Sequence, residues 1–171
     1  EAHSAGLLHR DIKPQNLFLC RMGVDYDVLK LLDFGLACSF REGNEHITRT
    51  GAITGTPAYM PPERGMAQEA DERSDLYSLG CVAYFMLTGE AVFTGDPLAV
   101  MLQHIRNAPR APSAATKQQI PEDLDRIVLT CLEKVPEKRP GSALELWELL
   151  ADSSVAGRWT PKRSELWWRE F

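Results

Sequence analysis

A short polar stretch near the start of the chain, residues 9–16, carries most of the side chains that could do chemistry. It holds a carboxylate, Asp11, an ammonium, Lys13, and an amide, Asn16, around a turn-forming proline. A second carboxylate, Asp33, follows the next apolar run. Oxygen ligands of this kind beside a lysine suit Mg²⁺ and a polyphosphate, and a well-placed acid can serve as a general base.

Two apolar runs are expected to position these groups. Residues 16–20 and 28–32 are typical of β-strands, and the polar connection 21–27 suits the turn between them. The resulting hairpin has one polar loop before its first strand and Asp33 just after its second. We therefore expect the groups at its two ends to share one pocket, although a lone Asp11 could simply cap its own backbone.

Several motifs in this order resemble the protein kinases. Residues 9–16 match H-R-D-x-x-x-x-N and residues 33–35 match D-F-G. The later landmarks of the family are similar to Gly55-Thr56-Pro57-Ala58-Tyr59, Pro61-Pro62-Glu63, Asp75-Leu76-Tyr77-Ser78-Leu79-Gly80 and Arg139. The resemblance implies a mainly α fold, the C-terminal lobe of a kinase, in which a helical bundle holds a short β-hairpin carrying the catalytic and D-F-G loops.

The resemblance assigns roles in phosphoryl transfer to five residues. It implies that Asp11 accepts the proton of the attacking hydroxyl and that Lys13 follows the γ-phosphate of ATP. Thr56 would bridge these two groups. Asn16 and Asp33 would bind Mg²⁺ and, with Lys13, the nucleotide. The implied cofactors are thus ATP and Mg²⁺, and the offset of Lys13 from Asp11 resembles Ser/Thr-specific kinases.

Further residues receive structural roles from the same resemblance. It implies that Glu63 forms an ion pair with Arg139. It also implies that Asp75 accepts a hydrogen bond from the backbone near His9 and Arg10. The full structural set is His9, Phe34, Gly35, Glu63, Asp75 and Arg139.

Regulation is implied by an arginine next to the catalytic acid. Arg10 could pair with a phosphorylated threonine, since a phosphate brings about −1.5 to −2 charges. We expect Thr48 and Thr50 to be the modified residues, although a threonine-rich loop can also be merely polar. An activating kinase partner or a dimer could then supply the phosphate.

The organisation of the chain is predicted as two parts. Residues 1–151 are expected to form the kinase C-terminal lobe, and residues 152–171 a tail with a short aromatic helix starting at Thr160-Pro161. No G-x-G-x-x-G motif is present, so we expect the chain's own N-terminal lobe to be absent and this segment alone to be inactive. The tail aromatics are expected to pack on the lobe, with docking to another domain as the alternative.

Cap and periodicity rules predict the remaining helices. Residues 1–8 read as the end of a helix. Ser74 or Asp75 is expected to cap a buried helix closed by Gly89. Three further helices are expected: one starts at Asp96-Pro97, one contains residues 124–132 and ends by Pro136, and one runs from Ser142 to about Ala151. Residues 107–116 are expected to form a loop.

Composition excludes several classes of function. The 19 basic and 24 acidic residues give a net charge of −5, which argues against a nucleic-acid partner. The four cysteines are widely spaced, which favours free thiols over disulfides or zinc. No apolar run is long enough for a membrane segment. We expect a cytoplasmic location, with anchoring of a longer parent protein left open.

The sequence therefore predicts a Ser/Thr protein kinase of bacterial receptor-like type, acting on hydroxyls of protein substrates. Two alternatives remain: a pseudokinase or binding scaffold, and a kinase-like small-molecule phosphotransferase. The complete set of Asp11, Lys13, Asn16 and Asp33 disfavours the first. The segment around Thr56 disfavours the second.

Overall fold

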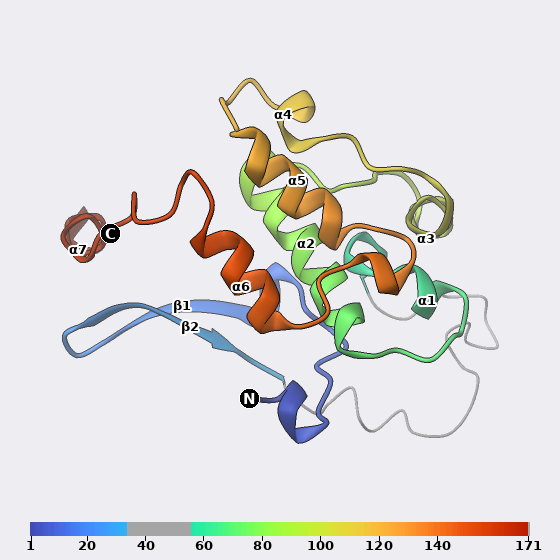
Figure 1. The fold of residues 1–171 in the computed structure, drawn as a ribbon, viewed down its shortest axis with the longest axis horizontal. Helices are drawn as coiled ribbons and strands as arrows, with labels where there is room; N and C mark the ends of the chain where they lie inside the picture. Colours follow the sequence, from blue (N-terminus) through green and yellow to red (C-terminus); the bar gives the residue numbers. More distant parts are fainter. Residues whose placement is uncertain (34–55, 171) are drawn as a thin grey trace.

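The computed structural model describes residues 1–33 and 56–170, of which about half are helical, beside one two-stranded antiparallel sheet (Figure 1). Phe34, Gly35, Thr48 and Thr50 lie outside this described part. The α-helices are α1 (Pro62–Gly65), α2 (Glu72–Thr88), α3 (Pro97–Arg106), α4 (Pro112–Ala115), α5 (Glu122–Cys131), α6 (Ala143–Ala151) and α7 (Pro161–Glu170). The strands are β1 (Leu17–Met22) and β2 (Asp25–Leu31), and short 3-10 turns are η1 (His3–Ala5), η2 (Pro14–Asn16), η4 (Pro57–Tyr59) and η5 (Pro136–Lys138).

The predicted hairpin is present, with longer strands and a tighter turn than expected. Strands β1 and β2 pair antiparallel, with Leu17 opposite Leu31. Gly23 has a φ of 63°, a left-handed conformation that glycine adopts without steric cost. Beyond the ladder, the Leu32 amide donates to the Asn16 carbonyl at 2.9 Å. The residue after Leu32 therefore starts beside the loop that precedes β1.

Helix α2 is the buried centre of the helical body, and α5 runs alongside it (Figure 1). Tyr77 and Cys81 of α2 pack against Val128 of α5 in the main core cluster. The two helices approach closely at Gly80, where an added Cβ would lie 2.7 Å from the Cys131 Cβ. Glycine is required here by space, because no real side-chain atom tolerates that separation.

The predicted start of α2 was wrong. The helix begins at Glu72, and Asp71 is its N-cap, with its side chain accepting from the Arg73 amide. Ser74 and Asp75 lie in the first turn and are buried. All three residue types can cap a helix, and it is burial that assigns Ser74 and Asp75 to other partners.

Other boundaries also differ from the prediction. Residues 1–8 contain only the single turn η1, which ends at Gly6 with a φ of 72°. Helix α5 stops at Cys131, before Pro136, and α4 lies inside the predicted loop 107–116. The capping of α6 is as predicted, since the Ser142 hydroxyl accepts from the Glu145 amide at 3.1 Å.

Two of the compositional expectations can be compared with the described residues. Cys20, Cys81 and Cys131 are free thiols there, while Cys38 lies outside that part. Within residues 1–33 and 56–170, no helix has both the length and the apolar character needed to cross a bilayer.

Candidate active site

A buried carboxylate from α2 holds the polar loop at residues 9–16. Asp75 Oδ2 accepts from the His9 amide at 2.8 Å, and Asp75 Oδ1 accepts from the Arg10 amide at 2.8 Å. His3 Nε2 also lies 2.9 Å from Asp75 Oδ2. Arg10 has a φ of 65°, which is unusual for a residue with a Cβ. The two amide bonds offset the cost of that conformation and fix the backbone just before Asp11.

The His9 ring connects this loop to the far end of the hairpin. His9 is buried, and its Nε2 lies 2.8 Å from the Leu32 carbonyl oxygen. Its Nδ1 accepts from the Asp11 amide at 3.3 Å. Since a carbonyl can only accept, Nε2 carries the proton and Nδ1 is the acceptor. One imidazole thus ties the backbone of Asp11 to the residue that precedes Asp33.

Asp11, Lys13 and Asn16 come together as one polar group. Lys13 Nζ lies 2.7 Å from Asp11 Oδ2. The Asn16 amide nitrogen donates to the Asp11 carbonyl at 2.8 Å and to Asp11 Oδ2 at 3.2 Å. Both amide hydrogens of Asn16 are therefore used, which leaves its Oδ1 as an acceptor. Among the described residues, no hydrogen-bond donor is paired with that oxygen.

Asp33 follows β2 directly and is exposed. Its φ of 62° places it, like Arg10, in the left-handed region. The bonds of Leu32 to Asn16 and His9 bring its backbone to the same end of the hairpin as the polar loop. Non-glycine residues in this conformation gather at functional sites. Arg10 and Asp33 are two such residues, one before β1 and one after β2.

Thr56 lies at the same pocket as Asp11. Both residues line a small pocket with Arg10 and Arg64. Within the described residues, no hydrogen bond joins Thr56 to Asp11 or Lys13. Arg64 donates from Nη1 to the Arg10 carbonyl, so two guanidinium groups lie close to the polar loop. No hydrogen bond or ion pair of the Arg10 side chain occurs within residues 1–33 and 56–170.

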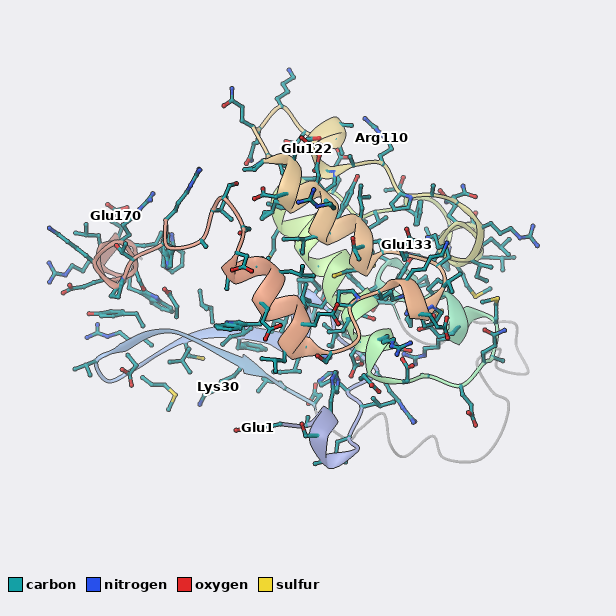
Figure 2. The ribbon with its side chains drawn as sticks, in the orientation of Figure 1. Glu1, Lys30, Arg110, Glu122, Glu133 and Glu170 are labelled. Atoms are coloured by element: carbon teal, nitrogen blue, oxygen red, sulfur yellow. The ribbon has the colours of Figure 1, made fainter. Side chains whose placement is uncertain are left out.

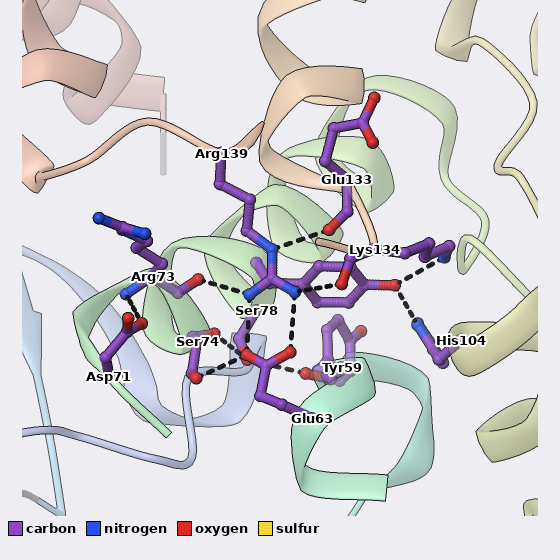
Figure 3. A network of polar contacts seen from close by, with 11 residues as sticks. Tyr59, Glu63, Asp71, Arg73, Ser74, Ser78, His104, Glu133, Lys134 and Arg139 are labelled. Atoms are coloured by element: carbon purple, nitrogen blue, oxygen red, sulfur yellow. Dashed lines mark hydrogen bonds and ion pairs between the residues drawn. The ribbon is translucent and has the colours of Figure 1, made fainter. Parts of the chain in front are cut away.

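Glu63 and Arg139 form a buried bidentate ion pair (Figure 3). The Nη1–Oε1 and Nη2–Oε2 distances are both 2.8 Å. Ser74 adds a hydroxyl donor to Glu63 Oε1 at 2.6 Å. Burial alone would raise the pKa of Glu63, but the hydrogen bonds from Arg139 and Ser74 outweigh it and lower the pKa. The carboxylate stays ionised and joins α1 to the segment after α5.

A second polar chain extends from this pair to His104 of α3 (Figure 3). The Arg139 guanidinium lies 4.8 Å from the Tyr77 ring centroid. The Tyr77 hydroxyl lies 2.8 Å from His104 Nδ1 and accepts from Lys134 Nζ at 3.1 Å. Burial, with the nearby Lys134 charge, lowers the pKa of His104 to about 4. His104 is therefore neutral at pH 7, which its role as acceptor for the Tyr77 hydroxyl requires.

Among the acidic, histidine and cysteine side chains of residues 1–33 and 56–170, no group of three or more could hold a metal ion. The predicted ligand pair contains only one such side chain, Asp33, with an amide, Asn16. A hard cation that keeps several water and substrate oxygens needs no more than this from the protein.

Comparison with known proteins decides the family. The profile of the protein kinase domain matches residues 2–151. The chain belongs to the protein kinase family. The matched residues end at α6, and the tail with α7 lies outside them.

Several curated relatives are named as serine/threonine-protein kinases. Serine/threonine-protein kinase PknB of Mycobacterium tuberculosis is 42% identical over 146 residues, which is 85% of this chain and 22% of the relative. The probable serine/threonine-protein kinase SCO3848 of Streptomyces coelicolor is 44% identical over 146 residues, 85% of this chain and 21% of its own length. The probable kinase CE0033 of Corynebacterium efficiens is 36% identical over 162 residues, 91% of this chain and 24% of the relative. The kinase domain described here thus spans under a quarter of these relatives.

Sequence reasoning missed three contacts near the site. Arg64 follows the predicted Glu63 directly, yet nothing in its spacing indicated a bond to Arg10. The position of His3 beside Asp75 was also missed, because η1 was predicted as a regular helix. The third is the contact of the tail with the hairpin at Asp27, described below.

Proposed function

We propose that this kinase domain transfers the γ-phosphate of ATP to serine and threonine hydroxyls of protein substrates. The observation that carries the proposal is the single polar group of Asp11, Lys13 and Asn16, which His9 connects to the carbonyl of Leu32, the residue before Asp33. Membership of the kinase family and relatives named as Ser/Thr kinases support the same reaction. Phosphoryl transfer depends mainly on positioning and charge neutralisation, which this group can supply.

Asp11 is the proposed general base. Its carboxylate is half-exposed at the pocket, so a substrate hydroxyl can reach it. The base takes the hydroxyl proton as the oxygen attacks phosphorus, and the ADP oxygen leaves on the opposite side. Lys13, already 2.7 Å from Asp11, can follow the charge of the moving phosphoryl group. Thr56 lies at the same pocket and could bridge the two in the complex with substrate.

Asn16 and Asp33 are the proposed Mg²⁺ ligands. The orientation of the Asn16 amide fits the role, because its nitrogen is held by Asp11 and its oxygen remains an acceptor. Mg²⁺, when bound there, would neutralise charge on the phosphates. The residues of this chain would supply the orientation: the hairpin connects the two ligands, and Asp75 and His9 hold the polar loop that precedes Asn16.

We further propose that residues 1–151 are the C-terminal lobe and that an N-terminal lobe completes the ATP site. Arg10 and Arg64 would bind a phosphate on Thr48 or Thr50, since both guanidiniums lie by the polar loop. Mass spectrometry of the active protein should find phosphate on one of these threonines. Its absence from both would end the regulatory part of the proposal.

The intact protein with γ-labelled ATP tests the reaction. Labelled phosphate is expected on serine or threonine of protein acceptors, and Asp11→Asn should lower the transfer rate at least about 100-fold, the usual contribution of a general base. The exposed Asp152→Asn, which removes the same charge far from the loop, serves as control. Transfer that survives in D11N, or that goes only to small-molecule acceptors, would contradict the proposal.

A further inference from the structure

Trp159, just before the C-terminal helix α7, and Trp168 within it both bind one carboxylate of the hairpin, Asp27. Trp159 donates its indole N–H to Asp27 Oδ2 at 2.7 Å, and Trp168 donates its indole N–H to Asp27 Oδ1 at 2.8 Å. Each oxygen of Asp27 thus receives one indole from the far end of the chain. Side chains fill the space between α7 and the hairpin (Figure 2). Hydrogen bonds to a charged acceptor are stronger than those between neutral groups.

The backbone at Asp27 is unusual in the same place. Its φ of 57° lies in the left-handed region, and the pairing of β1 with β2 shifts register between Cys20 and Met22. Aspartate and asparagine tolerate this conformation better than other residues with a Cβ. The irregular part of β2 is therefore also the part that α7 binds.

The hairpin needs support from outside its own ladder. An isolated two-stranded hairpin is marginally stable in water. Phe18, Leu19 and Leu29 are 49%, 47% and 59% exposed, so the strands bury little apolar surface on their own. Among the described residues, α7 is the helix that packs most extensively on β2. This helix lies outside residues 2–151, the part that matches the kinase family.

We propose that Asp27 is a positioning residue for phosphoryl transfer: by holding Trp159 and Trp168, it anchors α7 on the hairpin and so fixes Asn16 relative to Asp33. The two candidate Mg²⁺ ligands, residues 16 and 33, lie at the paired ends of the two strands, one just before β1 and one just after β2. Loss of the α7 contact frees the strands to twist and shear, which changes the separation of those ends. This inference rests on the proposed function and concerns the same site.

Variants that remove only the polar contact give the sharpest test, carried out in the intact protein. Trp159→Phe and Trp168→Phe keep an aromatic ring and delete the indole N–H. Asp27→Asn keeps the size and the left-handed tolerance, but its amide can accept only one of the two donors. Matched controls are Asp25→Asn on the same strand and Trp147→Phe on α6, where Trp147 is 64% exposed.

Hydrogen exchange measured by mass spectrometry reports the docking itself. The W159F/W168F double variant should exchange the amides of residues 17–31 about tenfold faster, a change equivalent to about 1.4 kcal/mol. D27N should show a similar gain, and both controls should match the unmodified protein. Unchanged exchange in the double variant would overturn the proposal, because α7 would then not be holding the hairpin.

Binding of ATP as a function of Mg²⁺ concentration reports the positioning. We expect D27N and the double variant to need about tenfold more Mg²⁺ for half-maximal nucleotide binding, with D25N unchanged. Faster exchange with an unaltered Mg²⁺ requirement would show that α7 stabilises the hairpin without positioning the ligands, and would overturn the proposal. Failure of the proposed function has a different signature, since the unmodified protein would then transfer no phosphate to protein acceptors.

Discussion

The bond network of Asp75 makes a specific prediction about the polar loop. Its Oδ1 accepts from the Arg10 amide, while its Oδ2 accepts from the His9 amide and faces His3. An asparagine has one acceptor oxygen, so Asp75→Asn must turn an NH₂ group toward at least one of these buried donors. Leaving a buried donor unpaired costs about 1–3 kcal/mol.

We therefore expect D75N to lower the free energy of unfolding of the 171-residue chain by about 2–3 kcal/mol, because the charge that strengthened the remaining bond is also lost. Urea unfolding followed by tryptophan fluorescence measures this, with D152N as the exposed control. Amide exchange at His9 and Arg10 should accelerate at the same time, since both lose a charged acceptor. In the intact protein, the transfer rate should fall as well.

The reasoning would be refuted by a change smaller than about 0.5 kcal/mol, which is the usual effect of a surface substitution. It would equally be refuted if D75N destabilised the chain and left exchange at His9 and Arg10 unaltered. The loop would then be held by something other than this carboxylate.

Three further predictions concern the helical body. Glu63→Gln should lower the free energy of unfolding by about 3–5 kcal/mol, because the Arg139 guanidinium is left buried without its charged partner. A decrease under about 1 kcal/mol, measured by urea unfolding, would show that the pair is dispensable. His104 has a pKa of about 4 in the folded chain, against about 6.5 unfolded, so stability should fall by about 3 kcal/mol as the pH drops through that interval. In His104→Phe the decline between pH 6.5 and 5 should vanish, and a slope equal to that of the unmodified chain would contradict the assignment. Gly80→Ala should lower the free energy of unfolding by about 1–3 kcal/mol, because the added methyl group overpacks against Cys131. An unchanged melting temperature would show that α2 and α5 can move apart without a loss of stability.

The hairpin and the polar loop were predictable because their signals are local. Two apolar runs on either side of a polar connection indicated the strands, and the His9–Asn16 spacing indicated the loop. The same local rules misplaced the start of α2, since Asp71, Ser74 and Asp75 are all good caps. Only tertiary burial distinguishes them.

The contacts that hold the site were harder to predict because they join distant segments. The bidentate pair of Glu63 with Arg139 came from the family resemblance and not from any pattern in the chain. The bridge from His9 to Leu32 depends on which ring nitrogen carries the proton. The binding of Trp159 and Trp168 to Asp27 spans most of the sequence, and composition alone suggested only that the tail aromatics would pack somewhere.

A structure of the intact protein with Mg²⁺ and a non-hydrolysable ATP analogue tests the central claim most directly. The account predicts that Asn16 Oδ1 and an Asp33 carboxylate oxygen both bind one Mg²⁺ at about 2.0–2.1 Å, with Asp11 and Lys13 at the γ-phosphate. Side chains of Asn16 and Asp33 on separate surfaces, unable to reach the same ion, would contradict it.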